Sequence, residues 1–226
     1  MNARKTIDKC NNQGYILDVD DKIRIKPLKD VIDSNGIEFR FFGTLNYYYR
    51  MDELDRVLKD NRHLKKCLQR FFKCEIRTIL FNEKHTNESS NNYGGFHRHW
   101  VMEDIPESIW LNPSPQMATF MQELDEKHDS CIYFGCLTGS MPSDEMKIQL
   151  IKKVIKGFHA STPNGSKGLD IRLIYNIDGL LSYCTKQRHH NIPHEYVIDT
   201  KSSNYLDDFF IRRMHSYIRQ RQLTLL

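Results

Sequence analysis

The pattern of hydrophobic and polar positions along the chain predicts alternating strands and helices through its middle part. Four stretches rich in aromatic and β-branched residues are typical of strands, at residues 37–47, 75–83, 96–102 and 170–175. Apolar residues recur at helical spacing in three segments between them, at residues 52–72, 116–128 and 144–158. A short apolar run at residues 131–137 predicts one further strand.

The two ends of the chain have weaker patterns. Residues 1–36 are polar and charged, with a short strand predicted at residues 22–26, and we expect them to form a loosely attached leader. Beyond residue 190 the composition shifts toward His, Asn, Asp and Arg, and a last helix is predicted at residues 206–219. We therefore expect a leader at 1–36, a folded domain at 37–190, and a C-terminal extension at 191–226 that packs as a helix.

The order of these elements indicates the fold class. The strands at 75–83 and 96–102 are separated by a polar loop rich in Asn and Ser, so they are expected to pair as a hairpin. The full order is strand, helix, two strands, helix, strand and helix, in which hairpin-type neighbours favour antiparallel pairing. We predict an α+β fold with a ferredoxin-like or RRM-like antiparallel sheet and helices packed against it.

Composition and charge narrow the class of protein only slightly. The chain has 226 residues, of which 27% are charged and 39% hydrophobic, as is ordinary for a soluble globular domain. No apolar run approaches the roughly 20 residues of a membrane span, so we expect a cytoplasmic protein without a membrane partner. The net charge of +4 is compatible with a nucleic-acid partner but does not require one. The six cysteines lack paired C-x-x-C spacing and are expected to be reduced.

Candidate metal ligands lie on the third predicted strand and its neighbour. His97 and His99 are two residues apart, so they share a face of the strand and can converge on one cation. Glu83, at the end of the preceding strand, is expected to lie across the hairpin from them. A carboxylate with two neutral imidazoles suits Mn²⁺ or Mg²⁺. His85 and Glu88 are alternative third ligands, and a plain amphipathic surface strand is the alternative interpretation of the histidines.

A candidate nucleophile lies on the last helix of the predicted domain. Asn176 can cap this helix, which would place Tyr183, Lys186 and Gln187 on one face. A tyrosine with its usual pKa of about 10 is a poor nucleophile at neutral pH. A weaker nucleophile is sufficient when a cation polarises the phosphate and a lysine stabilises the developing charge. Tyr-x-x-Lys also occurs on ordinary amphipathic helices, so a role in chemistry depends on a metal site nearby.

Candidate nucleic-acid contacts follow the first predicted strand. Aromatic side chains can stack on bases while basic and amide groups hold the phosphates. Five residues are candidates for this role: Asn46, Tyr47, Tyr49, Arg50 and Gln187. Phe41 and Phe42 in the same strand are equally compatible with the hydrophobic core.

Three motifs in this order resemble the HUH-type replication initiators, the rolling-circle Rep proteins of plasmids and small single-stranded DNA replicons. The motifs are Phe-Gly-Thr-Leu-Asn at 42–46, Gly-Phe-His-Arg-His at 95–99 and Tyr-Cys-Thr-Lys at 183–186. The resemblance spans roughly residues 37–188. Arg98 stands where the family has a hydrophobic residue, so the far face of the strand must tolerate or expose a guanidinium, which could extend along Trp100 to reach solvent or a DNA phosphate. Gly43 stands where a second bulky residue is expected, which indicates a bulge or a close approach to the backbone.

The resemblance implies metal-dependent, site-specific nicking and joining of single-stranded DNA. In this scheme His97, His99 and Glu83 hold Mn²⁺ or Mg²⁺. Tyr183 attacks the DNA to form a 5′-phosphotyrosine link, and Lys186 assists it. The implied role is that of a single-tyrosine endonuclease that initiates rolling-circle replication of a plasmid or phage-like replicon at single-stranded or hairpin origin DNA. The chain contains no G-x-x-x-x-G-K-[ST] sequence, so a separate helicase is expected to open the duplex.

Two alternatives remain open from the sequence. A single-tyrosine transposase or relaxase of the same fold would use the same chemistry, although in relaxases the tyrosine usually precedes the histidines. A non-catalytic DNA-binding domain would keep the sheet without the reaction. Its DNA binding would weaken with salt but would not respond to chelators.

Overall fold

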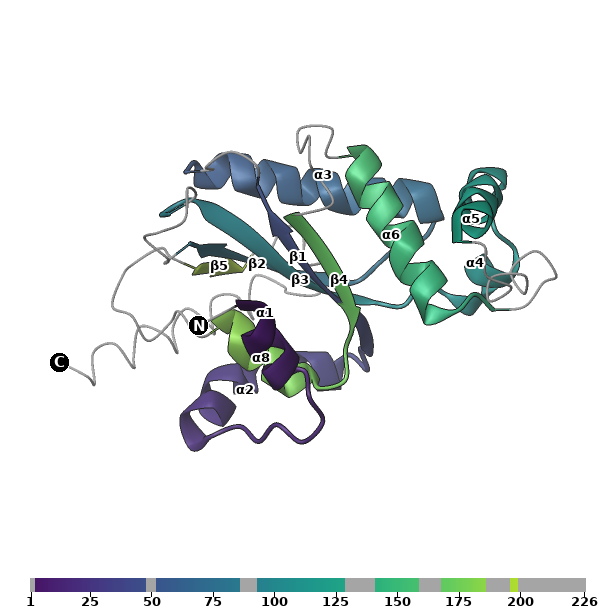
Figure 1. Ribbon diagram of the computed structural model, residues 1–226. Coiled ribbons are helices and arrows are strands. Elements are labelled where there is room, and N and C mark those ends of the chain that lie inside the picture. Colours follow the sequence, from purple (N-terminus) through teal and green to yellow (C-terminus); the bar gives the residue numbers. More distant parts are fainter. Residues whose placement is uncertain are drawn as a thin grey trace.

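The computed structural model describes residues 3–47, 52–85, 93–128, 141–158, 168–185 and 196–198. A five-stranded sheet with the order β4-β1-β3-β2-β5 forms its centre, and all four pairs of neighbouring strands are antiparallel (Figure 1). The strands are β1 (Phe39–Asn46), β2 (Thr78–Lys84), β3 (Phe96–Glu103), β4 (Leu169–Leu173) and β5 (Tyr196–Ile198). The helices are α1 (Ala3–Cys10), α2 (Val19–Ser34), α3 (Leu54–Phe72), α4 (Glu107–Leu111), α5 (Pro115–His128), α6 (Asp144–Phe158) and α8 (Ile177–Thr185).

The connectivity β1-α3-β2-β3-α6-β4 is the β-α-β-β-α-β arrangement of ferredoxin-like folds. Helices α4 and α5 are inserted between β3 and α6, and β5 adds to the free edge of β2. The predicted α+β fold with an antiparallel sheet and packed helices is therefore confirmed. None of the described helices is long and apolar enough to cross a membrane.

Most of the predicted elements between residues 37 and 185 are confirmed with small shifts at their ends. Helix α6 has the predicted bounds, whereas the strand predicted at 170–175 ends two residues earlier, at Leu173. The strand predicted at 131–137 and the helix predicted at 206–219 lie outside the described residues.

The strand predicted at residues 22–26 is wrong, because these residues belong to helix α2. The Asp18 carboxylate accepts a hydrogen bond of 2.7 Å from the backbone N–H of Asp21 and caps the helix. The alternation of Ile23 and Ile25 with charged residues suggested a strand. The buried apolar positions are instead Ile25, Leu28 and Ile32, which follow helical spacing, and Arg24 is buried beside them.

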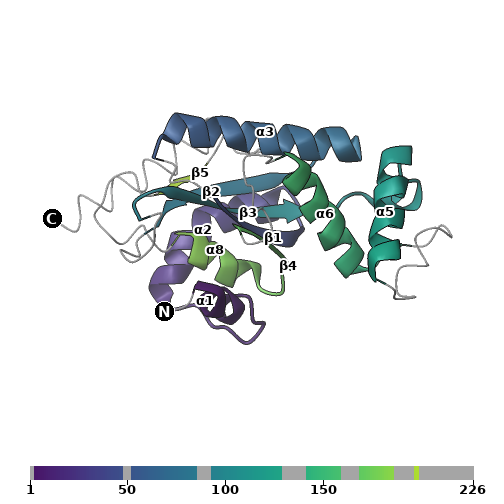
Figure 2. The same ribbon diagram turned by 45° about the horizontal axis from the view of Figure 1, so that its top comes forward.

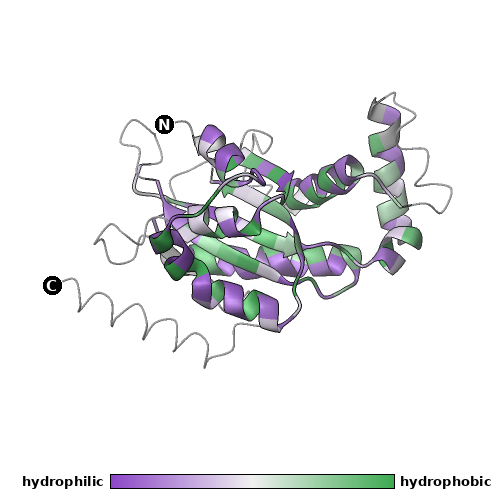
Figure 3. Cartoon of the chain, turned by 90° about the horizontal axis from the view of Figure 1, so that it is seen from below, coloured by the Kyte–Doolittle hydropathy of each residue, from purple (hydrophilic) through white to green (hydrophobic). Residues whose placement is uncertain are grey.

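Helices cover both faces of the sheet. Helices α3 and α6 lie on one face, and α1, α2 and α8 lie on the other, as Figures 1 and 2 show together. Along the helices hydrophilic positions alternate with hydrophobic ones, as expected for elements with one face toward solvent (Figure 3).

The N-terminal segment packs closely on the sheet, in contrast to the loosely attached leader expected from the sequence. Ile7 of α1 and Leu28 of α2 are buried in one hydrophobic cluster with Leu180 of α8 and Phe42 of β1. The second cluster, on the other face, joins α3, α5 and α6 to the sheet. The apolar residues of the N-terminal segment complete this core because the helices place them on one face.

Gly43 explains how β1 and β3 approach each other. It lies opposite Trp100 in the strand pairing, and a Cβ at this position would lie 2.0 Å from the indole ring. This confirms the close approach expected from a glycine in a strand. The register shift in β1 lies between Phe39 and Phe41, so Gly43 is not a bulge.

Candidate metal centre

Strand pairing brings the three predicted metal ligands together. In the antiparallel register of β2 and β3, Glu83 lies directly opposite His97. His99, two residues further along β3, points to the same face of the sheet. Within the described part of the chain, Glu83, His97 and His99 are the group of side chains that could hold a metal ion.

The distances between the three donor atoms fit one cation. The Nε2 atoms of His97 and His99 are 3.0 Å apart, and the Oε2 atom of Glu83 is 3.4 Å and 3.5 Å from them. Ligands with bonds of about 2.1 Å in neighbouring positions around one ion are separated by roughly 3.0–3.4 Å. The two nitrogens and one oxygen therefore lie close enough to one another to bind the same divalent ion.

The environment of the three ligands is enclosed. Glu83 is 0% exposed and His99 is 1% exposed. A carboxylate with so little contact with water needs a nearby positive charge or hydrogen-bond donors to offset its lost hydration. A divalent cation between Glu83 and the imidazoles would supply this charge, so the donor set is chemically consistent with a metal.

Neighbouring residues orient the ring of His99. The Oγ1 atom of Thr44 on β1 lies 2.9 Å from Nδ1 of His99, and the ring of Phe42 stacks against the imidazole with centroids 5.6 Å apart. In the tautomer that carries its proton on Nδ1, His99 donates to Thr44 and its Nε2 lone pair faces Glu83 and His97. This is the arrangement by which outer residues set the tautomer of a metal-binding histidine. The predicted motif at 42–46 contained Thr44, but the sequence analysis assigned it no role.

His85, an alternative third ligand, lies beside the group rather than within it. Its ring stacks on that of His97, with centroids 4.4 Å apart. Burial, followed by the proximity of His97, lowers the pKa of His85 to about 4, so its ring is neutral at physiological pH. Its backbone is held at the hairpin end by hydrogen bonds of 2.8 Å with Gly94 and Gly95. Glu88, the other alternative, lies outside the described residues.

Tyr183, on helix α8, contacts the candidate metal centre through His99. The amide oxygen of Asn176 accepts a hydrogen bond of 2.8 Å from the backbone N–H of Gly179, which confirms the predicted cap. The ring of Tyr183 contacts that of His99, with centroids 5.2 Å apart and an angle of 72° between the planes. The tertiary structure thus brings together the histidine strand and the tyrosine helix, 84 residues apart at these two positions.

Burial is the dominant influence on the Tyr183 hydroxyl. Tyr183 is 5% exposed, and this burial raises the pKa of its phenol well above the usual value. The negative charge of Glu83 is the next cause and acts in the same direction. The phenol is therefore held in its neutral form. A positive charge near Glu83 would offset the negative charge of Glu83 and so reduce its effect on the pKa of Tyr183.

Helix α2 holds the tyrosine helix through Arg24, a residue that the sequence analysis missed. The guanidinium of Arg24, 7% exposed, donates to Oγ of Ser182 at 2.8 Å and to Oγ1 of Thr185 at 3.0 Å. It also forms an ion pair with Asp21. Arg24 and Tyr183 both line a crevice of about 320 Å³ between α1, α2 and α8. Arg24 was assigned to a strand in the sequence analysis, so no signal linked it to α8.

The candidate nucleic-acid contacts are only partly described. Asn46 pairs with His97 at the end of the sheet. Tyr47 is 6% exposed, and its hydroxyl accepts a hydrogen bond from the guanidinium of Arg98. Four of the predicted site residues lie outside the described residues: Tyr49, Arg50, Lys186 and Gln187.

The expectation that Arg98 reaches solvent is wrong. Arg98 is 0% exposed and lies over the ring of Tyr47, with its guanidinium carbon 5.5 Å from the ring centre. Since alternate residues of a strand face opposite sides, Arg98 points away from His97 and His99, toward the face covered by α3. A buried arginine with an aromatic partner therefore lies between the two histidines in the sequence.

Comparison of the chain with protein-family models, with curated proteins and with solved structures found no match. The arguments about its function therefore rest on the geometry of Glu83, His97, His99 and Tyr183.

Proposed function

We propose that this protein is a metal-dependent endonuclease that nicks and rejoins single-stranded DNA through Tyr183. The observation that carries the proposal is the meeting of a two-histidine, one-carboxylate donor set with a tyrosine ring 5.2 Å from His99. The order of the three motifs, which resembles that of HUH-type replication initiators, supports it.

Each residue has a defined role in the proposed reaction. His97, His99 and Glu83 would hold Mn²⁺ or Mg²⁺, which when bound polarises the phosphodiester as a Lewis acid. The Tyr183 oxygen attacks the phosphorus, the bond to the 3′ oxygen of the preceding nucleotide breaks, and the tyrosine proton passes to that oxygen. The products are a 5′-phosphotyrosine link and a free 3′-hydroxyl. We assign Lys186 to stabilising the developing charge.

The burial of Tyr183 sets a requirement for this reaction. Because the residue is 5% exposed and lines the crevice between α1, α2 and α8, the reaction requires this crevice to widen enough to admit a DNA strand. Local opening of this kind is common for elements that bind ligands.

Incubation with Mn²⁺ and a pool of single-stranded oligonucleotides tests the proposal. We expect a covalent protein–DNA species on a denaturing gel, lost with EDTA and lost in Tyr183→Phe. Tyr175→Phe is the matched control, because Tyr175 lies just before α8 and is 59% exposed. Adducts that persist in Tyr183→Phe would rule out this nucleophile.

A non-catalytic DNA-binding domain is the second candidate, and the near-complete burial of Tyr183 is the observation that favours it. This candidate predicts salt-sensitive DNA binding and no covalent species with any oligonucleotide.

Within the catalytic proposal we favour initiation of rolling-circle replication at single-stranded or hairpin origin DNA, in the cytoplasm and with a separate helicase. A single-tyrosine transposase or relaxase would share the chemistry. The DNA sequence and structure that the enzyme cleaves would distinguish these roles.

A further inference from the structure

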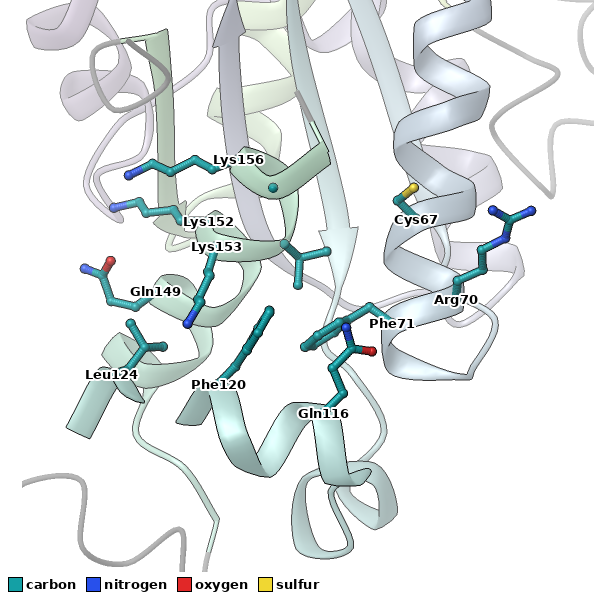
Figure 4. Close-up of a pocket in the computed structure, with 12 residues that line it drawn as sticks. Cys67, Arg70, Phe71, Gln116, Phe120, Leu124, Gln149, Lys152, Lys153 and Lys156 are labelled. Atoms are coloured by element: carbon teal, nitrogen blue, oxygen red, sulfur yellow. The ribbon is translucent and has the colours of Figure 1, made fainter. Parts of the chain in front are cut away.

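A basic groove lies on the side of the molecule away from the candidate metal centre. It has a volume of about 750 Å³ and is formed by the C-terminal halves of α3 and α6 together with α5 (Figure 4). These three helices pack on the face of the sheet opposite to α1, α2 and α8, which cover the side of His99 and Tyr183. The groove is therefore separate from the centre described above.

The floor of the groove contains two aromatic rings in contact with each other. Phe71 of α3 stacks on Phe120 of α5, with centroids 5.4 Å apart. The ammonium group of Lys153 lies 4.0 Å from the centre of the Phe120 ring and forms an ion pair with Glu123. Both faces of the Phe120 ring thus have partners, and no open ring is left for a base to stack on.

The rims of the groove carry positive charge. Lys152 and Lys156 extend side by side from α6 at one rim, and Arg70 of α3 lies at the other (Figure 4). Among the described residues, no ion pair is recorded for these three cations, and no acidic side chain lines the groove. Gln116 and Gln149 add amide groups to the lining.

We propose that this groove binds the sugar–phosphate backbone of a nucleic-acid strand. Lysine, arginine and glutamine side chains are the groups that contact phosphate oxygens without reading sequence. The groove has cations at both rims and an apolar floor. This arrangement suits a polyanion such as a nucleic-acid strand, whose phosphate groups lie along its outer edge. An acidic peptide shares the charge but usually anchors through hydrophobic or aromatic side chains in a pocket, and here the Phe120 ring already has partners on both faces.

The location of the groove determines which part of the DNA it holds. Because the groove and the metal centre lie on opposite faces of the sheet, one nucleotide cannot occupy both. The groove takes DNA that flanks the reacting phosphodiester. This inference extends the proposed function, since it rests on a nucleic-acid substrate, but it requires neither the metal nor Tyr183.

The test measures binding of a fluorescein-labelled 30-nucleotide poly-dT strand to the full chain in the presence of EDTA. Fluorescence anisotropy gives the affinity at several salt concentrations. We expect Lys152→Gln with Lys156→Gln to weaken binding about tenfold at low salt and to reduce the salt slope by about 1 to 2. Lys152→Arg with Lys156→Arg keeps the charges and should bind like the wild type.

The matched control is Lys22→Gln with Lys26→Gln, because these lysines have the same spacing on α2, are exposed and lie on the other face. We expect this variant to stay within twofold of the wild type. Equal losses in both glutamine variants, or none in the groove variant, would overturn the proposal. Stronger displacement by poly-glutamate than by unlabelled poly-dT would also overturn it and would point to an acidic protein partner.

The outcome is independent of the nicking reaction. If the groove variant binds like the wild type while Mn²⁺ still yields the Tyr183 adduct, the groove proposal fails and the proposed enzyme remains. If binding depends on the groove but no adduct forms with any oligonucleotide, the groove remains and the proposed enzyme fails.

Discussion

At the scale of single residues, two small side chains determine the geometry around the candidate centre. Gly43 leaves room for the indole of Trp100, and this allows β1 to pair closely with the histidine strand. Thr44, the next residue, then reaches Nδ1 of His99 at 2.9 Å. The two residues therefore act together. Gly43 leaves the space that the Trp100 ring fills, and Thr44 forms a hydrogen bond with His99.

Gly43→Ala should lower the free energy of unfolding by about 1 to 3 kcal/mol or more, because its Cβ would overlap the Trp100 ring. Urea unfolding measures the change. Gly157→Ala is the matched control, since a Cβ there meets nothing within 4 Å, and in helix α6 it should be neutral or stabilising. Equal stability of the two variants would contradict the role given to Gly43.

Thr44→Val should weaken Mn²⁺ binding about 10- to 100-fold, because it removes the partner that orients His99. Isothermal titration calorimetry with the full chain measures the affinity. Thr119→Val, on α5 and exposed, is expected to leave the affinity unchanged. An unaltered affinity in Thr44→Val would show that Thr44 does not orient a metal ligand.

At the scale of elements, the position of the tyrosine helix depends on the N-terminal helices. Arg24 joins α2 to α8 through Ser182 and Thr185. Gly179 of α8 lies so close to α1 that a Cβ there would be 2.0 Å from the carbonyl oxygen of Cys10. Tyr183 is therefore positioned by contacts that involve both N-terminal helices.

Arg24→Met should destabilise the protein by about 3 kcal/mol, because it leaves Asp21 and the Ser182 and Thr185 groups without their buried partner. Thermal or urea unfolding of the full chain checks this. Lys26→Met, which removes an exposed pair with Asp30 on the same helix, should change the stability by less than about 0.5 kcal/mol. Similar losses in both variants would argue against a special role for Arg24.

At the scale of the whole molecule, the sheet separates the two candidate sites. One face carries the candidate metal centre under α1, α2 and α8, and the other carries the basic groove between α3, α5 and α6. Since the candidate metal ligands come from two adjacent strands of the sheet, a bound ion would link these strands in the folded state.

Addition of Mn²⁺ should therefore raise the unfolding temperature of the whole chain. At 100 times the dissociation constant the ion contributes about 2.7 kcal/mol, which for a chain of this size corresponds to roughly 5–10 °C. Differential scanning calorimetry with and without Mn²⁺ measures the shift. Glu83→Gln should abolish it, and a shift that survives this substitution would place the metal elsewhere.

The sequence by itself determined most of the elements between residues 37 and 185, the shared face of His97 and His99, and the Asn176 cap of the tyrosine helix. These features depend on periodicity and on short-range hydrogen bonds, which are visible in a local stretch of residues. The charged N-terminal helices were missed because their few apolar residues are recognisable as a core only once their partners are known.

Only the tertiary structure decided that Glu83, rather than His85, joins the two histidines, because this depends on the register of the β2–β3 hairpin. It also decided that Arg98 is buried against Tyr47, that Arg24 holds α8, and that Tyr183 contacts His99 while nearly buried. Each of these facts is a contact between residues distant in the chain. Such contacts arise from the packing of whole elements, which no local pattern specifies.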